Sequence, residues 1–147
     1  MNEKKIVKEK TDLLVFDAYP LLVLFRKQTG WERVREILAD ASRNDLLHCM
    51  SLINLGEVFY SLLRSEGETL AQWVLKEIQL LPLQIINPTY EQMLRASRFK
   101  AQGGISFADC FAAALAQEYG IPILTGDREF EVVERQGIAI EWLPKNR

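Results

Sequence analysis

The residues of this chain most able to carry chemistry are four acids in four separate sequence contexts: Asp17, Glu57, Asp109 and Asp127. Three of these contexts look like the loop between a strand and the helix that follows it. In an open parallel sheet such loops share one edge, so the four side chains could converge there. Carboxylates brought that close repel one another and shift one another's pKa values unless a cation lies among them. The pattern therefore predicts a divalent metal site.

Short apolar runs alternate along the chain with longer segments whose apolar residues recur every three or four positions. This alternation predicts an α/β fold with a parallel sheet. Ser51 is expected to cap the third helix, and the pair Asn87-Pro88 to open the fifth. The expected strands are 13–17, 46–50, 83–86, 122–124 and 138–143, and the expected helices are 18–25, 31–41, 52–65, 70–81, 88–102, 106–119 and 128–135.

Each of the four acids also has an ordinary structural explanation. Asp17 and Asp127 follow strands and could cap the next helix, and Asp109 stands three residues after a serine, as in a capping box. Glu57 lies inside an apolar helix, where a solvated face is the usual explanation, but Asn54 one turn earlier would place an amide beside it. Strand ends one, two and four each supply an acid at or just beyond them, and this conjunction favours the metal site.

Length and composition indicate one domain at residues 13–147 after a charged leader at residues 1–12. The leader lacks the apolar core of a signal peptide, and no run approaches the roughly 20 apolar residues that span a bilayer. Cys49 and Cys110 stand far apart in apolar surroundings, which indicates core packing in a reducing compartment. We therefore expect a soluble, cytoplasmic protein with no membrane partner.

The charge balance and the absence of other motifs narrow the function classes. Eighteen basic and twenty acidic residues give a net charge of −2, which argues against a strongly basic nucleic-acid binder. A metal would neutralise several of the acids, so the balance does not exclude a polyanionic substrate. A haloacid-dehalogenase phosphatase needs a second aspartate two residues after Asp17, where this chain has Tyr19, and no glycine-rich dinucleotide motif follows the first strand.

Four segments carry a family resemblance: VFDA at 15–18, NLGEV at 54–58, SFADCFAAA at 106–114 and LTGDREF at 124–130. In order and context they resemble the PIN domain and, within it, the VapC-type toxin ribonucleases, over residues 13–143. The chain departs from the pattern in its longer leader and in Tyr19, at a position where small hydroxyl residues are frequent. The resemblance implies an acidic quartet of catalytic and metal-binding residues, Asp17, Glu57, Asp109 and Asp127, with the polar neighbours Asn54, Ser106 and Thr125.

The resemblance also implies a fold and an activity. The fold is a three-layer α/β/α arrangement around a mostly parallel sheet of about five strands. The activity is hydrolysis of RNA phosphodiesters with Mg²⁺ or Mn²⁺, ions that prefer oxygen ligands, and the implied partners are a small antitoxin and a second copy of the chain. The alternative is a catalytically silent PIN-like module that holds RNA or a protein.

Basic and apolar residues suggest where partners would bind. Phosphate contacts supply most nucleic-acid affinity, and the candidates for them are Arg128, Arg26 and Lys27. The helix that carries Phe59, Tyr60, Leu62 and Leu63, and its neighbour with Trp73, could face a partner or be buried in the same subunit. The single histidine, His48, lies in the second expected strand, which favours a structural role over general-base work.

Overall fold

The computed structural model describes residues 13–144, and at their centre lies a sheet of five parallel strands. The strands lie in the order β3-β2-β1-β4-β5, with β1 in the middle. Because every pair is parallel, the carboxyl ends of all the strands meet at one edge of the sheet. The strands are β1 (Val15–Phe16), β2 (His48–Ser51), β3 (Leu83–Ile86), β4 (Ile123–Thr125) and β5 (Ile140–Trp142).

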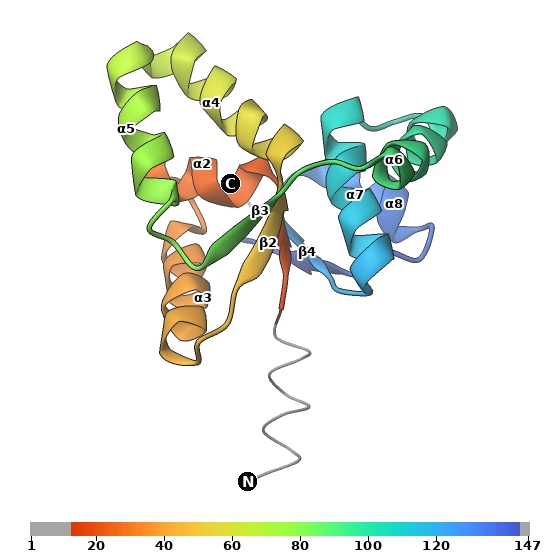
Figure 1. Ribbon diagram of the computed structural model, residues 1–147, viewed down its shortest axis with the longest axis horizontal. Helices are drawn as coiled ribbons and strands as arrows, with labels where there is room; N and C mark the ends of the chain where they lie inside the picture. The colour runs from red at the N-terminus through yellow and green to blue at the C-terminus, as the bar shows by residue number, and fades with distance from the viewer. Residues whose placement is uncertain (1–12, 145–147) are drawn as a thin grey trace, which may run out of the picture.

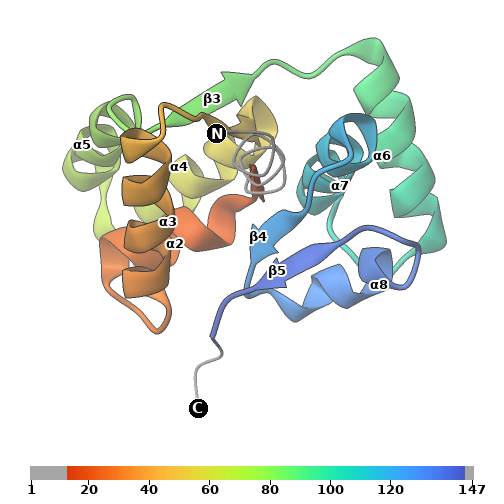
Figure 2. The same cartoon turned by 90° about the horizontal axis from the view of Figure 1, so that it is seen from below.

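Helices cover both faces of the sheet, so the described part of the chain forms three layers (Figures 1 and 2). Helices α2 to α5 pack on one face, and α6, α7 and α8 on the other. This confirms the predicted three-layer α/β/α fold with a central parallel sheet. The helices are α2 (Ala18–Arg26), α3 (Trp31–Arg43), α4 (Leu52–Glu66), α5 (Glu68–Ile78), α6 (Tyr90–Gln102), α7 (Phe107–Tyr119) and α8 (Glu131–Glu134), with a short 3₁₀ turn, η1 (Arg128–Phe130), before α8.

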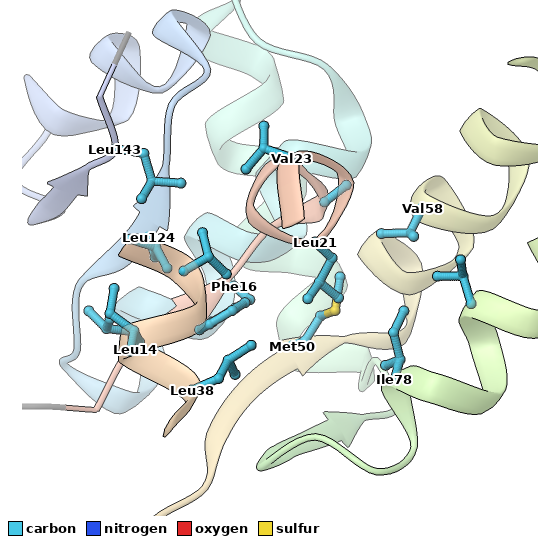
Figure 3. Close-up of a cluster of buried hydrophobic side chains, with 14 of the residues drawn as sticks. Leu14, Phe16, Leu21, Val23, Leu38, Met50, Val58, Ile78, Leu124 and Leu143 are labelled. Atoms are coloured by element: carbon cyan, nitrogen blue, oxygen red, sulfur yellow. The ribbon is translucent and has the colours of Figure 1, made fainter. Parts of the chain in front are cut away.

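The sheet separates two hydrophobic clusters because successive residues of a strand point to opposite faces. In β1, Val15 packs with α6 and α7, whereas Phe16 packs with α2 to α5. In β4, Ile123 packs with α6 and α7, and Leu124 packs with α2 to α5. Figure 3 shows the cluster under α2, where Phe16 and Leu124 meet Leu21 of that helix. Burial on both faces explains why the strands are continuous apolar runs in the sequence.

Side-chain caps set several helix starts where the sequence predicts them. Ser51 Oγ accepts a hydrogen bond from the Ile53 N–H at 3.2 Å at the start of α4. Ser106 Oγ accepts one from the Asp109 N–H, also at 3.2 Å, at the start of α7. Each bond satisfies a backbone donor that the first turn of a helix leaves without a partner. Both expected caps are confirmed.

Other boundaries differ from the expectation. Helix α6 does not open at Asn87-Pro88; it begins at Tyr90, because Thr89 is the cap and its Oγ1 accepts from the Gln92 N–H at 3.1 Å. The expected last helix is instead the 3₁₀ turn η1 followed by one turn of α8. Strands β1 and β5 are shorter than their apolar runs. The predicted leader at residues 1–12 lies outside the described residues.

The structure tests two further expectations: that both cysteines pack in the core, and that no segment spans a membrane. Cys49 and Cys110 are both buried in the cluster under α7, and neither forms a disulfide. Core packing is thus confirmed for both. Among residues 13–144, the structure has no helix that is both long enough and apolar enough to cross a bilayer.

His48 anchors the start of the central strand, which yields a first prediction. Its Nδ1 accepts a hydrogen bond from the Leu14 N–H at 3.0 Å in a buried setting, beside the ring of Phe16. We expect His48→Leu to leave that N–H without an acceptor and to lower the free energy of unfolding by about 1–3 kcal/mol, measured by urea denaturation. The free energy of unfolding should fall less in His48→Asn, because asparagine retains an acceptor atom. An equal decrease in both variants would contradict this role of His48.

Candidate metal centre

The carboxyl edge of the sheet collects the four acids. Asp17 directly follows β1, and Asp127 stands two residues beyond β4. Asp109 lies in the first turn of α7, and Glu57 in the second turn of α4. The charges of Asp109, Glu57 and Asp127 all act on Asp17, which shows that the four side chains lie in one neighbourhood. Carboxylate oxygens of two of them, Asp109 and Asp127, lie within 4.8 Å of each other, and Asp17 and Glu57 lie near enough for their charges to act on this pair or be acted on by it.

Asp17 is held as a ligand would be, not as a helix cap. It occupies the N-cap position of α2 but makes no capping hydrogen bond. Its Oδ2 instead accepts from Thr125 Oγ1 at 3.1 Å, and Thr125 Oγ1 in turn accepts from the Asp127 N–H at 3.0 Å. Its Oδ1 is buried without a hydrogen-bond partner among the described residues. A buried carboxylate oxygen without a donor fits a position that faces a cation.

Asn54 joins the two helices that carry Glu57 and Asp109. It is fully buried, and its Nδ2 donates to the Ala108 carbonyl at 3.0 Å and to Glu57 Oε1 at 3.5 Å. The amide thus ties α4 to α7 and orients the Glu57 carboxylate. Within the described residues its Oδ1 has no hydrogen-bond partner, so a second buried oxygen at this site has a free lone pair.

Glu129 is a fifth acid at the site, in addition to the four that the sequence pattern predicts. Ligand oxygens of Asp109, Asp127 and Glu129 lie within 4.8 Å of one another. Glu129 Oε1 also accepts from the Ser106 N–H at 3.1 Å, and the Glu129 N–H donates to Asp127 Oδ1 at 3.0 Å. The available signal was its position two residues after Asp127, just beyond a strand.

Burial and mutual repulsion shift the carboxyls of the site upward. Burial raises the pKa of Asp109 to about 7, and the charges of Glu57 and Asp127 add to this. Burial, and then the charge of Asp109, raise the pKa of Asp17 well above its ordinary value. Burial likewise raises the pKa of Glu57. In the part of the chain that the structure describes, the charges acting on these three carboxyls all come from other acids.

A divalent cation fits this set of donors. The available atoms are carboxylate and amide oxygens, the ligands that Mg²⁺ and Mn²⁺ prefer. A cation among them would offset the repulsion that raises their pKa values. It could also bind the two buried oxygens that have no donor among the described residues. Asp17, Glu57, Asp109 and Asp127 could all contribute, with Glu129 beside Asp127.

The three basic candidates lie in different places. The Arg128 guanidinium, next to Asp127, stacks 4.4 Å from the ring centroid of Trp142 and pairs with Glu131 at 3.6 Å. Arg26 pairs with Glu66 at 3.3 Å at the end of α4, nine residues beyond Glu57. The Lys27 ammonium lies 5.6 Å from the ring centroid of Trp31. Only Arg128 directly adjoins an acid of the site in sequence.

Comparison with known proteins gives the family. The sequence matches the PIN domain over residues 14–136, most of its length. The chain belongs to the PIN domain family. A search of curated protein sequences finds no relative of it.

Solved structures with the same fold include several bacterial proteins. VapC20 of Mycobacterium tuberculosis, described as a toxin that cleaves the sarcin-ricin loop, matches this PIN domain with a TM-score of 0.69 at 18% identity, over 89% of this chain and 99% of that one. DNA-bound VapBC of Salmonella typhimurium matches with a TM-score of 0.68 at 19% identity, over 88% of this chain and 96% of that one. A toxin-antitoxin complex of Klebsiella pneumoniae matches with a TM-score of 0.56 at 20% identity, over 80% and 89%.

The raised pKa of Asp109 predicts how the stability of the metal-free PIN domain depends on pH. An unfolded aspartate ionises near pH 4, whereas Asp109 in the folded protein ionises near pH 7. Between these values the folded state binds more protons than the unfolded state, so its stability falls as the pH rises. In EDTA we expect Asp109→Asn to be more stable than wild type by about 4 kcal/mol at pH 8 and by much less at pH 4.

Thermal unfolding across this pH range measures the difference. Asp45→Asn is a matched control, because Asp45 is exposed and asparagine tolerates its positive φ of 56°. The control should follow wild type at every pH. A constant difference between Asp109→Asn and wild type from pH 4 to pH 8 would contradict the assignment.

Proposed function

We propose that this PIN domain is a divalent-metal-dependent endoribonuclease and the toxin of a toxin-antitoxin pair. The observation that carries the proposal is the convergence of Asp17, Glu57, Asp109 and Asp127 with buried oxygens that have no donor within residues 13–144. Such an arrangement is costly unless a cation neutralises it. Of the solved structures with the same fold, VapC20 is described as a toxin that cleaves the sarcin-ricin loop, and another is described as a toxin-antitoxin complex; both support the choice of reaction and of biological role.

In the proposed reaction the acids hold Mg²⁺ or Mn²⁺ and the polar neighbours hold the acids. Thr125 fixes Asp17 and the backbone of Asp127, and Asn54 fixes Glu57. When bound, the metal supplies a water of lowered pKa and offsets the charge that builds on the phosphate.

No side-chain nucleophile is needed for this reaction. His48 is buried in β2 with its Nδ1 bonded to the Leu14 N–H. Ser106 Oγ accepts from a backbone N–H, and Thr125 Oγ1 donates to Asp17. These hydroxyls therefore serve as a helix cap and as a brace for the site, and attack on the phosphate is left to water.

The partners we propose are a small antitoxin and a second copy of the chain. Of the apolar residues considered for this purpose, Leu62 is buried in the core, whereas Tyr60 and Trp73 are about half exposed. Trp73 packs edge-on against Phe25, which joins α5 to α2. An exposed aromatic surface on α4 and α5 is consistent with a binding partner there.

The alternative is a catalytically silent module that binds RNA or a protein. The presence of all four acids, each at the carboxyl edge, weighs against it. Retained Mn²⁺ binding without any cleavage would favour it.

Cleavage of total cellular RNA by the purified protein is the direct test. We expect discrete fragments with Mg²⁺ or Mn²⁺ and none in EDTA, and a loss of at least about 100-fold in rate for Asp17→Asn and for Asp109→Asn. The variants should remain folded, since each removes a charge from a crowded site. Metal-dependent cleavage that persists in both variants would contradict the proposal, as would the absence of cleavage by folded, antitoxin-free wild type.

The binding of RNA phosphates by basic residues gives a separate prediction. Arg128 adjoins Asp127, whereas Arg26 and Lys27 lie at the far end of α2, about 13 Å along the helix axis from Asp17. We propose that Arg128 contacts the phosphate nearest the cleavage site and that Arg26 and Lys27 contact phosphates further along the strand. Arg128→Ala should therefore raise KM for RNA most, by roughly fivefold to tenfold, and reduce its salt dependence.

Kinetics at several salt concentrations measure both effects. Arg33→Ala is the control, because Arg33 is an exposed arginine on α3 whose partner is the neighbouring Glu36. If KM changes no more for Arg128→Ala than for Arg33→Ala, Arg128 does not contact the RNA substrate.

A further inference from the structure

Gly126 stands between Thr125 and Asp127, two residues of the site, yet its backbone does not require a glycine. Its φ lies outside the left-handed region, unlike that of Gly120 or Gly137. Any residue could adopt such a conformation. The reason for a glycine at this position must therefore be the space around it.

The ring of Tyr19 occupies the space in which a side chain at position 126 would begin. A Cβ built on Gly126 would lie 2.4 Å from Tyr19 Cε1, 2.6 Å from Cζ and 2.9 Å from the hydroxyl oxygen. Non-bonded carbon atoms pack at about 3.5–4.0 Å, so even a methyl group would force the ring or the turn to move. Tyr19 is half-buried and packs against the hydrophobic cluster under α2, which limits the movement of the ring.

This contact is a second link, beside the packing of Leu124 on Leu21, between the start of α2 and the end of β4. The first is the hydrogen bond from Thr125 to Asp17, which lies two residues before Tyr19. One link therefore acts on the residue before Gly126, and the other on Gly126 itself. Together they determine where the chain leaves β4 and enters the turn that presents Asp127.

We propose that Tyr19 is a positioning residue whose ring, packed on Gly126, sets the distance between Asp17 and Asp127 and so tunes the affinity of the site for a divalent cation. Tyr19 need touch neither the cation nor the RNA. The inference rests on the proposed metal-dependent function, because it concerns the same site. It differs in naming a residue outside the acidic quartet and its polar neighbours.

A double-mutant cycle on the chain of residues 1–147 tests the proposal. The variants are Gly126→Ala, Tyr19→Ser, the double variant with both changes, and Tyr19→Phe. The readouts are Mn²⁺ affinity by isothermal titration calorimetry and thermal unfolding in EDTA, neither of which depends on RNA cleavage.

We expect Gly126→Ala to weaken Mn²⁺ binding by roughly tenfold, as is typical when a group that orients a ligand is disturbed. Tyr19→Ser alone should weaken Mn²⁺ binding by a smaller factor, because the ring then no longer packs on Gly126. The double variant should recover to the level of Tyr19→Ser, because the methyl group then has room. Tyr19→Phe should bind Mn²⁺ like wild type, since the ring carbons make the closest contacts.

Gly56→Ala is the matched control. Gly56 directly precedes Glu57, as Gly126 directly precedes Asp127, but a Cβ built on Gly56 would meet nothing within 4 Å. Gly56 is exposed within α4. This variant should bind Mn²⁺ normally and unfold at a higher temperature, because alanine is a better helix former than glycine.

The outcomes separate this inference from the proposed function. Wild type that binds no Mn²⁺ would overturn the proposed function. If wild type binds Mn²⁺, any of three results would overturn the role of Tyr19 and leave the proposed function standing: Tyr19→Ser binding like wild type, Gly126→Ala binding like wild type, or no recovery in the double variant. If Gly126→Ala does not fold, the metal-free unfolding decides: recovery of folding and of Mn²⁺ binding in the double variant supports the contact, and failure to recover overturns it.

Discussion

The crowding of buried carboxylates at one edge of the sheet is the constraint on which the rest of the structure depends. Asp17 and Asp109 are almost fully buried, and the charges that act on them are those of other acids of the site. Burying a carboxylate and placing it beside others both disfavour the folded state when the groups are ionised. The hydrophobic clusters on the two faces of the sheet must therefore offset this cost, and they do so close to the site, because Phe16 directly precedes Asp17 and Leu124 directly precedes Thr125.

The same repulsion explains why Asn54 and Thr125, the polar residues beside the acids, are hydrogen-bonded to protein groups and not exposed to solvent. Carboxylates that repel one another would move apart unless hydrogen bonds from other parts of the chain held them in place; such a bond is called a brace. Thr125 holds Asp17 to the turn of Asp127, and Asn54 holds α4 to α7. Glu129 bonds the backbone of Ser106, which fixes η1 to the start of α7. Each brace joins residues that are far apart in the sequence, so the site forms only when β1, β4, α4, α7 and η1 have assembled.

The parts of this arrangement that the sequence predicts are those encoded locally. The apolar runs indicate the strands, Ser51 and Ser106 indicate helix starts, and acids beyond strand ends indicate the shared edge; all three follow from short-range patterns. The parts it does not predict depend on residues brought together from far apart. Tyr19 meets Gly126 only because β1 and β4 are neighbours in the sheet, and strand order is not encoded in any single segment. Glu129 reaches the site because η1 is a tight turn where a longer helix was expected.

The negative charge at the carboxyl edge of the sheet also constrains the alternative function, a catalytically silent module that binds RNA. A phosphate that approaches uncompensated carboxylates meets charge of its own sign, so a module that holds RNA here needs a cation as much as a nuclease does. Metal binding alone therefore does not separate the two functions. A ligand present at about 1,000 times its dissociation constant stabilises a folded protein by about 4.1 kcal/mol, which is comparable with the cost, about 4 kcal/mol, of keeping an acid such as Asp109 ionised in the site. Cation binding and the folding stability of this edge are thus thermodynamically linked. A bound cation would hold the acids in the arrangement that catalysis requires.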